Sequence, residues 1–169
     1  MPKYYVMLVD LANQRMRVPV KALRNPYDGE AAYCAGMPQF FGGTDRKDRP
    51  PTAVMKEEVG QESRRTLELM VGPDHFFDSE NMFFYWADAD RWQETGTAWG
   101  PGRNKAEREM DRIEIVDLTR FNPQWSNDQL IAELIRQTNS EGAPQQGQDE
   151  FDESATREAF VELLRLLLG

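Results

Sequence analysis

Apolar residues follow two kinds of spacing along the chain. Short runs with alternating or continuous apolar character, bounded by Gly, Pro, Asn and Asp, predict strands. These runs are Lys3–Leu11, Arg15–Val20, Met37–Phe41, Thr66–Val71, Met82–Ala87 and the later part of Glu107–Leu118. Helical spacing predicts helices from Pro51 to about Arg64, from Ser126 to about Gln137, and from about Ser154 to Leu168. The pattern indicates a mixed α/β chain.

Two of these segments carry further local signals. Met82–Ala87 reads MFFYWA and is apolar on both faces, which is typical of a central strand covered on both sides. Ser126 and Gln129 have the spacing of a capping box, in which each side chain bonds the other residue's main-chain N–H at the start of a helix.

The C-terminal third separates into a linker and an apolar helix. Residues 139–153 are rich in Gly, Gln, Pro and acidic residues and predict a polar linker after a domain of residues 1–138. The helix in residues 154–169 carries leucines around much of its circumference, so it has to be buried. Packing on its own domain and packing against a second copy in a homodimer are both open at this point.

Composition limits the possible partners. The 169 residues carry a net charge of −9 and are 40% hydrophobic, which fits a folded domain and disfavours nucleic acid or an anionic membrane. A single cysteine, Cys34, excludes an internal disulfide, and a single histidine, His75, excludes a His-rich zinc site. The N-terminus lacks a signal-peptide pattern and no run approaches a membrane span, so we expect a cytoplasmic protein.

The helix after the double proline carries the strongest chemical signal. Glu58, Gln61 and Glu62 fall at i, i+3 and i+4, so their side chains share one face. Side-chain oxygens stacked in this way suit a hard divalent cation such as Mg²⁺, which removes their repulsion. The alternative is a solvated acidic face.

The surrounding stretch, Gln39–Arg65, resembles the signature of the Nudix hydrolase superfamily. That signature is a glycine, five residues, a glutamate, seven residues, then Arg-Glu-aliphatic-x-Glu-Glu-x-Gly. Counted from the first glycine of the match, the signature positions fall on Gly43, Arg49, Glu57, Glu58, Val59, Gln61, Glu62 and Arg64. Two other registers exist, one from Gly42 and one with a shortened loop. The register from Gly43 keeps both the loop length and an aliphatic residue at Val59.

The resemblance implies a fold and a chemistry. It implies an α/β (α+β) fold, a Nudix-like α/β/α sandwich with a mixed β-sheet, to which the C-terminal helix is an addition. It also implies hydrolysis of a pyrophosphate bond in a nucleoside diphosphate linked to another moiety, with Mg²⁺ or Mn²⁺. Glu58 and Glu62 would be the catalytic metal ligands, with Gln61 a weaker third, and Glu58 is alternatively the base. Glu107 or Glu109 would supply a further acid.

The resemblance also leaves room for substrate contacts outside the signature. The segment Asp88–Asn104 is a long aromatic loop, and such loops are often functional. The substrate's base or sugar would stack on Phe41, Trp92 or Trp99. The alternative is that the tryptophans cover the edge of the core.

Two classes of function therefore remain. The first is a divergent, active Nudix-type hydrolase acting on a small nucleotide derivative. The second is a Nudix-fold binding, regulatory or protein-interaction module that has lost catalysis. The departures at Arg49, Glu57, Gln61 and Arg64 favour the second class, and the retained Glu58 and Glu62 favour the first.

Overall fold

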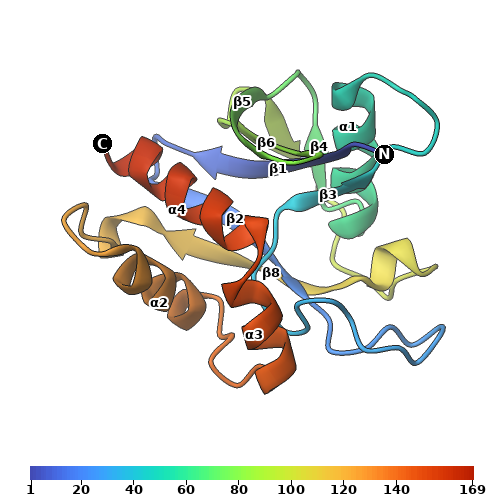
Figure 1. Cartoon of the computed structure of the whole chain (residues 1–169). Helices are drawn as coiled ribbons and strands as arrows, with labels where there is room; N and C mark the ends of the chain where they lie inside the picture. Colours follow the sequence, from blue (N-terminus) through green and yellow to red (C-terminus); the bar gives the residue numbers. More distant parts are fainter.

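The structure is a computed structural model that describes residues 1–169 and is built around one mixed β-sheet (Figure 1). The strand order is β5-β6-β1-β2-β8, and β3 also pairs with β1. β1 and β6 run parallel, whereas the other pairs are antiparallel. The strands are β1 Lys3–Asp10, β2 Arg15–Lys21, β3 Phe41–Thr44, β5 Asp74–Ser79, β6 Met82–Ala87 and β8 Met110–Asp117.

Helices cover both faces of this sheet, so the predicted α/β/α sandwich is confirmed. One face carries α1, Pro51–Glu62, together with a small two-stranded sheet of β4, Leu67–Leu69, and β7, Trp92–Glu94. The other face carries α2, Asn127–Gln137, and α4, Ala155–Leu168, with α3, Gln145–Asp152, beside them (Figure 1). None of the helices has the length and apolarity to span a membrane.

The residues of the central strand β1 show why the sheet needs a packed layer on each of its two faces. Val6 and Leu8 pack into the cluster under α1, whereas Met7 and Val9 pack into the cluster under α2 and α4. All four are fully buried. Successive side chains of a strand point to opposite faces, so a strand that is apolar at every position is stable only between two layers.

The capping box at Ser126 forms as the sequence predicts. The Ser126 hydroxyl accepts from the main-chain N–H of Gln129, and the Gln129 side chain accepts from that of Ser126. Helix α2 begins at the next residue, because the cap satisfies main-chain donors that the helix itself leaves unpaired.

The stretch expected to be a polar linker is part of the packed body. Residues 145–152 form α3, and Phe151 is fully buried in the larger core cluster. Gly147 sits so close to the main chain that a Cβ there would lie 2.3 Å from the carbonyl oxygen of Ala35. Phe151 and Gly147 therefore hold an otherwise polar segment against the body. The composition of the segment does not reveal these contacts.

Helix α4 packs within its own chain. Phe160, Leu163 and Leu164 are fully buried in the larger cluster, and the Phe160 ring lies 4.6 Å from that of Phe40 between centroids. Leu166 is the exception, with 52% of its surface exposed. The apolar stripe on which the homodimer hypothesis depended is therefore covered intramolecularly.

The loop Asp88–Asn104 and the segment before β6 contain strands that periodicity did not predict. β7 lies inside the loop and pairs with β4, and β5, with the sequence DHFFDS, pairs with β6. Both are polar at many positions, because they lie at sheet edges, where one side of the strand faces solvent.

Candidate active site

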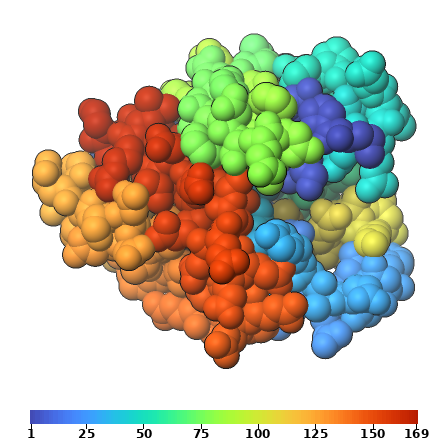
Figure 2. Space-filling view, in the orientation of Figure 1, coloured from blue at the N-terminus to red at the C-terminus, as the bar shows by residue number.

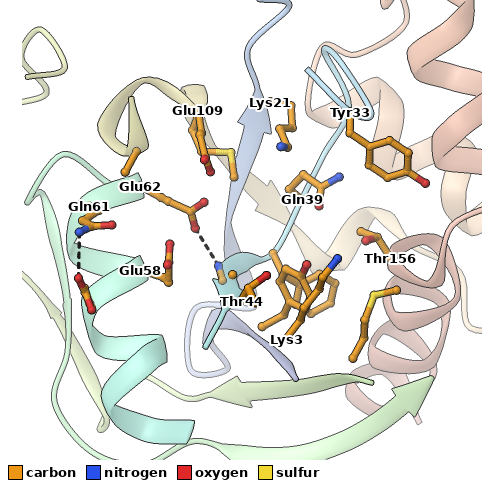
Figure 3. Close-up of a pocket in the computed structure, with 18 of the residues that line it drawn as sticks. Lys3, Lys21, Tyr33, Gln39, Thr44, Glu58, Gln61, Glu62, Glu109 and Thr156 are labelled. Carbon is orange, nitrogen blue, oxygen red and sulfur yellow. Dashed lines mark hydrogen bonds between the residues drawn. The ribbon is translucent and has the colours of Figure 1, made fainter. Parts of the chain in front are cut away.

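One cavity of about 730 Å³ lies between α1, the start of β1, the turn before β8 and the first turn of α4. In the space-filling view the surface is hollowed between the N-terminal segment and the orange start of α4 (Figure 2). Glu58, Gln61 and Glu62 from α1 line it, and so does Glu109. Three carboxylates from two separate parts of the chain point into one space (Figure 3).

Helix α1 carries an apolar stripe that packs on the sheet and, beside it, an acidic stripe that faces the cavity. Met55 and Val59 are fully buried against the sheet, and the acidic residues at 58 and 62 lie beside that stripe. The helix begins directly after Pro50, with Pro51 in its first turn, where a missing N–H costs nothing. The prolines therefore set the residue at which α1 begins, and the buried stripe sets the face on which its carboxylates lie.

Glu62 is the deepest of the carboxylates, with 1% of its surface exposed. Its Oε1 accepts a hydrogen bond of 2.8 Å from the main-chain N–H of Gly42. Burial, followed by the negative charges of Glu58 and Glu109, raises the pKa of Glu62 well above its usual value. The Gly42 contact ties the end of α1 to β3.

Glu58 lies over the other glycine of the pair. Burial, together with the charges of Glu109 and Glu57, raises its pKa to about 7. A Cβ on Gly43 would come within 2.8 Å of Glu58 Oε1, so any other residue at this position would force the Glu58 carboxylate to move. Burial, followed by the negative charges of Glu62, Glu58 and Glu109, raises the pKa of the Tyr5 phenol, which also lines the cavity, to about 12.

The structure separates Glu107 from Glu109, which the sequence left as alternatives. Glu107 is 3% exposed and faces away, accepting hydrogen bonds from the main chain and the side chain of Arg103. A single turn of 3₁₀ helix, Ala106–Arg108, comes before Glu109 and turns its side chain into the cavity (Figure 3). Glu109 is therefore the acid from outside α1 that the site contains.

Gln61 is at the edge of this group. It lines the cavity, and its Nε2 donates a hydrogen bond of 3.2 Å to Glu57 Oε1. Its remaining carbonyl oxygen is a neutral and weaker donor to a cation than a carboxylate would be.

Two positions of the resembled signature carry residues of exchanged charge, and these residues pair. Arg49 stands where the signature has a glutamate and Glu57 where it has an arginine, and their side chains form a salt bridge. The pair joins the loop after β3 to α1. The two departures from the signature therefore offset each other in charge.

Arg64 explains a third departure. It stands where the signature has glycine and adopts a left-handed φ of 51°, a conformation that glycine enters at least cost. Its guanidinium donates to the main-chain carbonyls of Glu107, Gly100 and Met110. These bonds hold a strained residue in place and anchor the segment that leads to Glu109.

The three aromatic residues expected to bind substrate do not line this cavity. Phe41 is fully buried in the cluster under α1. Trp92 is 6% exposed and donates its indole N–H to the carbonyl of Val9. Trp99 stacks on the Arg64 guanidinium, 4.3 Å from its centre to the ring, and borders a separate smaller cavity. The alternative, that the tryptophans cover the edge of the core, describes Trp92, whereas Trp99 is 36% exposed and lies outside both core clusters.

The cavity wall away from α1 contains residues that the sequence analysis did not select. They are Lys3, Lys21, Tyr33, Gln39 and Thr156 (Figure 3). No motif links them, because they come from four elements or loops far apart in the chain. The one sequence signal is scarcity: the chain has five lysines, and four of them, Lys3, Lys21, Lys47 and Lys105, line this cavity.

The chemistry of the carboxylate group fits a divalent cation. Carboxylate oxygens are the ligands that Mg²⁺ and Mn²⁺ prefer. Burial and the repulsion between neighbouring carboxylates raise the pKa values of Glu58 and Glu62, and a bound cation would offset both effects. In their present rotamers no three acidic, His or Cys side chains form a ready ligand cluster. Glu58 and Glu109 are half-buried at the cavity surface, so both have room to turn toward a shared ion.

The glycine pair gives a matched test of this geometry. Gly42→Ala would place a Cβ 2.2 Å from the Tyr4 carbonyl oxygen, so we expect it to displace β1 and lower the free energy of unfolding by about 3 kcal/mol. Gly43→Ala meets only the movable end of Glu58, so we expect near-normal stability and weaker Mn²⁺ binding. Thermal melts with and without Mn²⁺ distinguish the two. Equal melting temperatures for both variants would contradict the predicted close approach at Gly42.

The exchanged ion pair predicts a rescue. Arg49→Glu alone should destabilise the protein by about 1 kcal/mol, because half-exposed pairs contribute little and the new charge faces Glu57. Combining it with Glu57→Arg restores opposite charges in the reverse sense and should recover most of that loss. A double-mutant cycle on melting temperature measures the coupling. Strictly additive effects would mean that the two side chains do not interact in solution.

Comparison with known proteins gives no family assignment. No family model matches the chain, and no curated protein is similar to it. A crystal structure of an ADP-ribose pyrophosphatase from Streptococcus suis is similar over 83% of this chain and 91% of that one, with 10% sequence identity and a TM-score of 0.46. A likeness at this level says nothing about activity, so the function has to be inferred from the site itself.

Proposed function

We propose that this protein is a hydrolase that cleaves a pyrophosphate bond in a nucleoside diphosphate linked to another moiety, with Mg²⁺ or Mn²⁺ as cofactor. The observation that carries the proposal is the convergence of Glu58, Glu62 and Glu109 on one cavity whose opposite wall is basic. An acidic wall suits cations, and a basic wall suits phosphate. The cavity has the size of small-molecule sites in general, about 300–1,000 Å³.

The residues divide into two roles. Glu58 and Glu62 would hold the cation, with Glu109 as the further acid and Gln61 as a weak neutral ligand. A cation bound there supplies charge neutralisation for the phosphates and a lowered pKa for water. Alternatively, Glu58 would be the base and not a ligand, since a carboxyl group with a pKa of about 7 can accept a proton at neutral pH. Lys3 and Lys47, which also line the cavity, would hold the diphosphate in place.

A second candidate function is a binding module that has lost catalysis. The observation that favours it is Gln61, whose neutral amide replaces one of the resembled signature's carboxylates. A site with fewer charged ligands holds its cation less tightly. Such a protein would bind a nucleotide derivative without turning it over.

One assay separates the two candidates. The full chain is incubated with Mg²⁺ or Mn²⁺ and a panel of nucleoside diphosphate sugars, dinucleotides and nucleoside triphosphates, and the release of nucleotide products is measured. The hydrolase proposal expects metal-dependent turnover that Glu62→Gln reduces by about tenfold or more, as for loss of one charged ligand. Binding of panel members without turnover under either metal would favour the binding module.

A further inference from the structure

Three of the four lysines that line the cavity have no acidic partner in the protein. The ammonium group of Lys105 pairs with Asp28 at 2.7 Å, whereas those of Lys3, Lys21 and Lys47 have no carboxylate within 4.0 Å. Lys3 and Lys21 are half-buried and lie on the side of the cavity away from α1 (Figure 3). In a chain of net charge −9, cations left unpaired in one cavity point to an anionic ligand.

Gln39 adds a buried polar group to the same wall. It is 6% exposed, and its main-chain N–H is fixed by a bond of 2.8 Å to the carbonyl of Pro19. Its carboxamide faces the cavity (Figure 3) and has the buried thiol of Cys34 as its polar neighbour in the protein. The buried side-chain atoms that lack any partner do not include those of Gln39, so its carboxamide is open to the cavity and can bond a ligand there.

The first turn of α4 completes this part of the wall. Ser154 caps the helix by accepting from the main-chain N–H of Arg157. The N–H groups of Ala155 and Thr156 have no partner inside the helix, and both residues line the cavity. The positive end of a 14-residue helix therefore lies at the same wall as Lys21 and Gln39.

We propose that Lys21, Gln39 and the first turn of α4 bind a second anionic group of the substrate, a phosphate monoester carried outside the scissile diphosphate. The substrate class is then a nucleoside diphosphate derivative that bears an additional phosphate. The proposal rests on the proposed function for the placement of the diphosphate at the carboxylate wall. The subsite itself rests on the three groups just described.

Matched ligand pairs test the subsite. NADP and NAD differ by one phosphate monoester, and so do coenzyme A and dephospho-coenzyme A. Binding of each to the full chain is measured by calorimetry with Ca²⁺ in place of Mg²⁺, and turnover is followed in parallel. We expect the phosphorylated member of at least one pair to bind about tenfold more tightly, the effect of one additional charge-assisted contact.

Variants then assign that preference to the wall. Lys21→Met and Gln39→Met should each bring the affinity ratio toward one, whereas Lys56→Met, which removes the one lysine outside the cavity, should leave it unchanged. A ratio near one in the wild type for both pairs overturns the proposal. So does a ratio that survives in Lys21→Met, which removes a half-buried side chain and is not expected to unfold the protein.

Inorganic phosphate separates this proposal from the proposed function. Titrated without metal, it should raise the melting temperature of the wild type and of Glu58→Gln, but not that of Lys21→Met, because ligands that bind only the folded state stabilise it. That result supports the subsite even if no panel member is hydrolysed. Absence of stabilisation together with a ratio near one rejects the subsite even if hydrolysis is observed.

Discussion

A chain that ends at Glu153 is expected not to fold cooperatively. Removing residues 154–169 removes Ala159, Phe160, Leu163 and Leu164, which are all fully buried in the larger core cluster. Each large apolar side chain of this kind stabilises a fold by about 2–5 kcal/mol. Their sum approaches or exceeds the total stability of a typical domain, about 5–15 kcal/mol.

Single substitutions make the same prediction quantitative. Phe160→Ala should lower the free energy of unfolding by about 3–5 kcal/mol, because the ring packs against Phe40 and Phe151 at centroid distances of 4.6 and 6.3 Å. The matched control is Leu166→Ala on the same helix, where the side chain is 52% exposed and the change should stay within about 0.5 kcal/mol. Chemical denaturation measures both. If the truncated chain melted cooperatively near the wild-type temperature, α4 would be an appendage, as its sequence suggested.

The second large effect concerns the carboxylates and has opposite signs with and without metal. A carboxyl group whose pKa is higher in the folded than in the unfolded state stabilises the fold while protonated, and this contribution is lost as pH rises between the two values. For Glu58 the interval runs from the ordinary value of 4.5 to about 7. At about pH 8, ionised Glu58 therefore opposes folding in the absence of metal. Glu58→Gln and Glu62→Gln should each raise the metal-free melting temperature.

With Mn²⁺ the order should reverse. Metal at ten times its dissociation constant adds about 1.4 kcal/mol to the stability of the folded state, which corresponds to about 4 °C in a chain of this size. We expect that shift in the wild type and its loss in the Glu58→Gln/Glu62→Gln double variant. Glu158→Gln, an exposed glutamate on α4, is the control and should keep the full shift. If the double variant gained as much from Mn²⁺ as the wild type, the cation would bind elsewhere.

Much of the fold follows from local sequence. The apolar runs of β1, β2 and β6, the proline start of α1 and the capping box of α2 are encoded within a few residues of one another, so spacing alone predicts them. The elements that the sequence analysis did not predict also have a physical explanation. β5 and β7 are edge strands with polar sequences. α3 is held by the close approach of Gly147 to Ala35, more than 100 positions away, and by the burial of Phe151 in the larger core cluster.

The sequence alone placed Glu58 and Glu62 on one helical face, because residues four apart in a helix of 3.6 residues per turn lie one above the other. Only the tertiary structure decided what faces them. The turn that directs Glu109 inward, the exchanged pair of Arg49 and Glu57, and the gathering of four lysines all depend on which elements pack together. Helical and strand periods are local properties of the chain, whereas the composition of a cavity depends on long-range packing, and a single sequence carries little local trace of it.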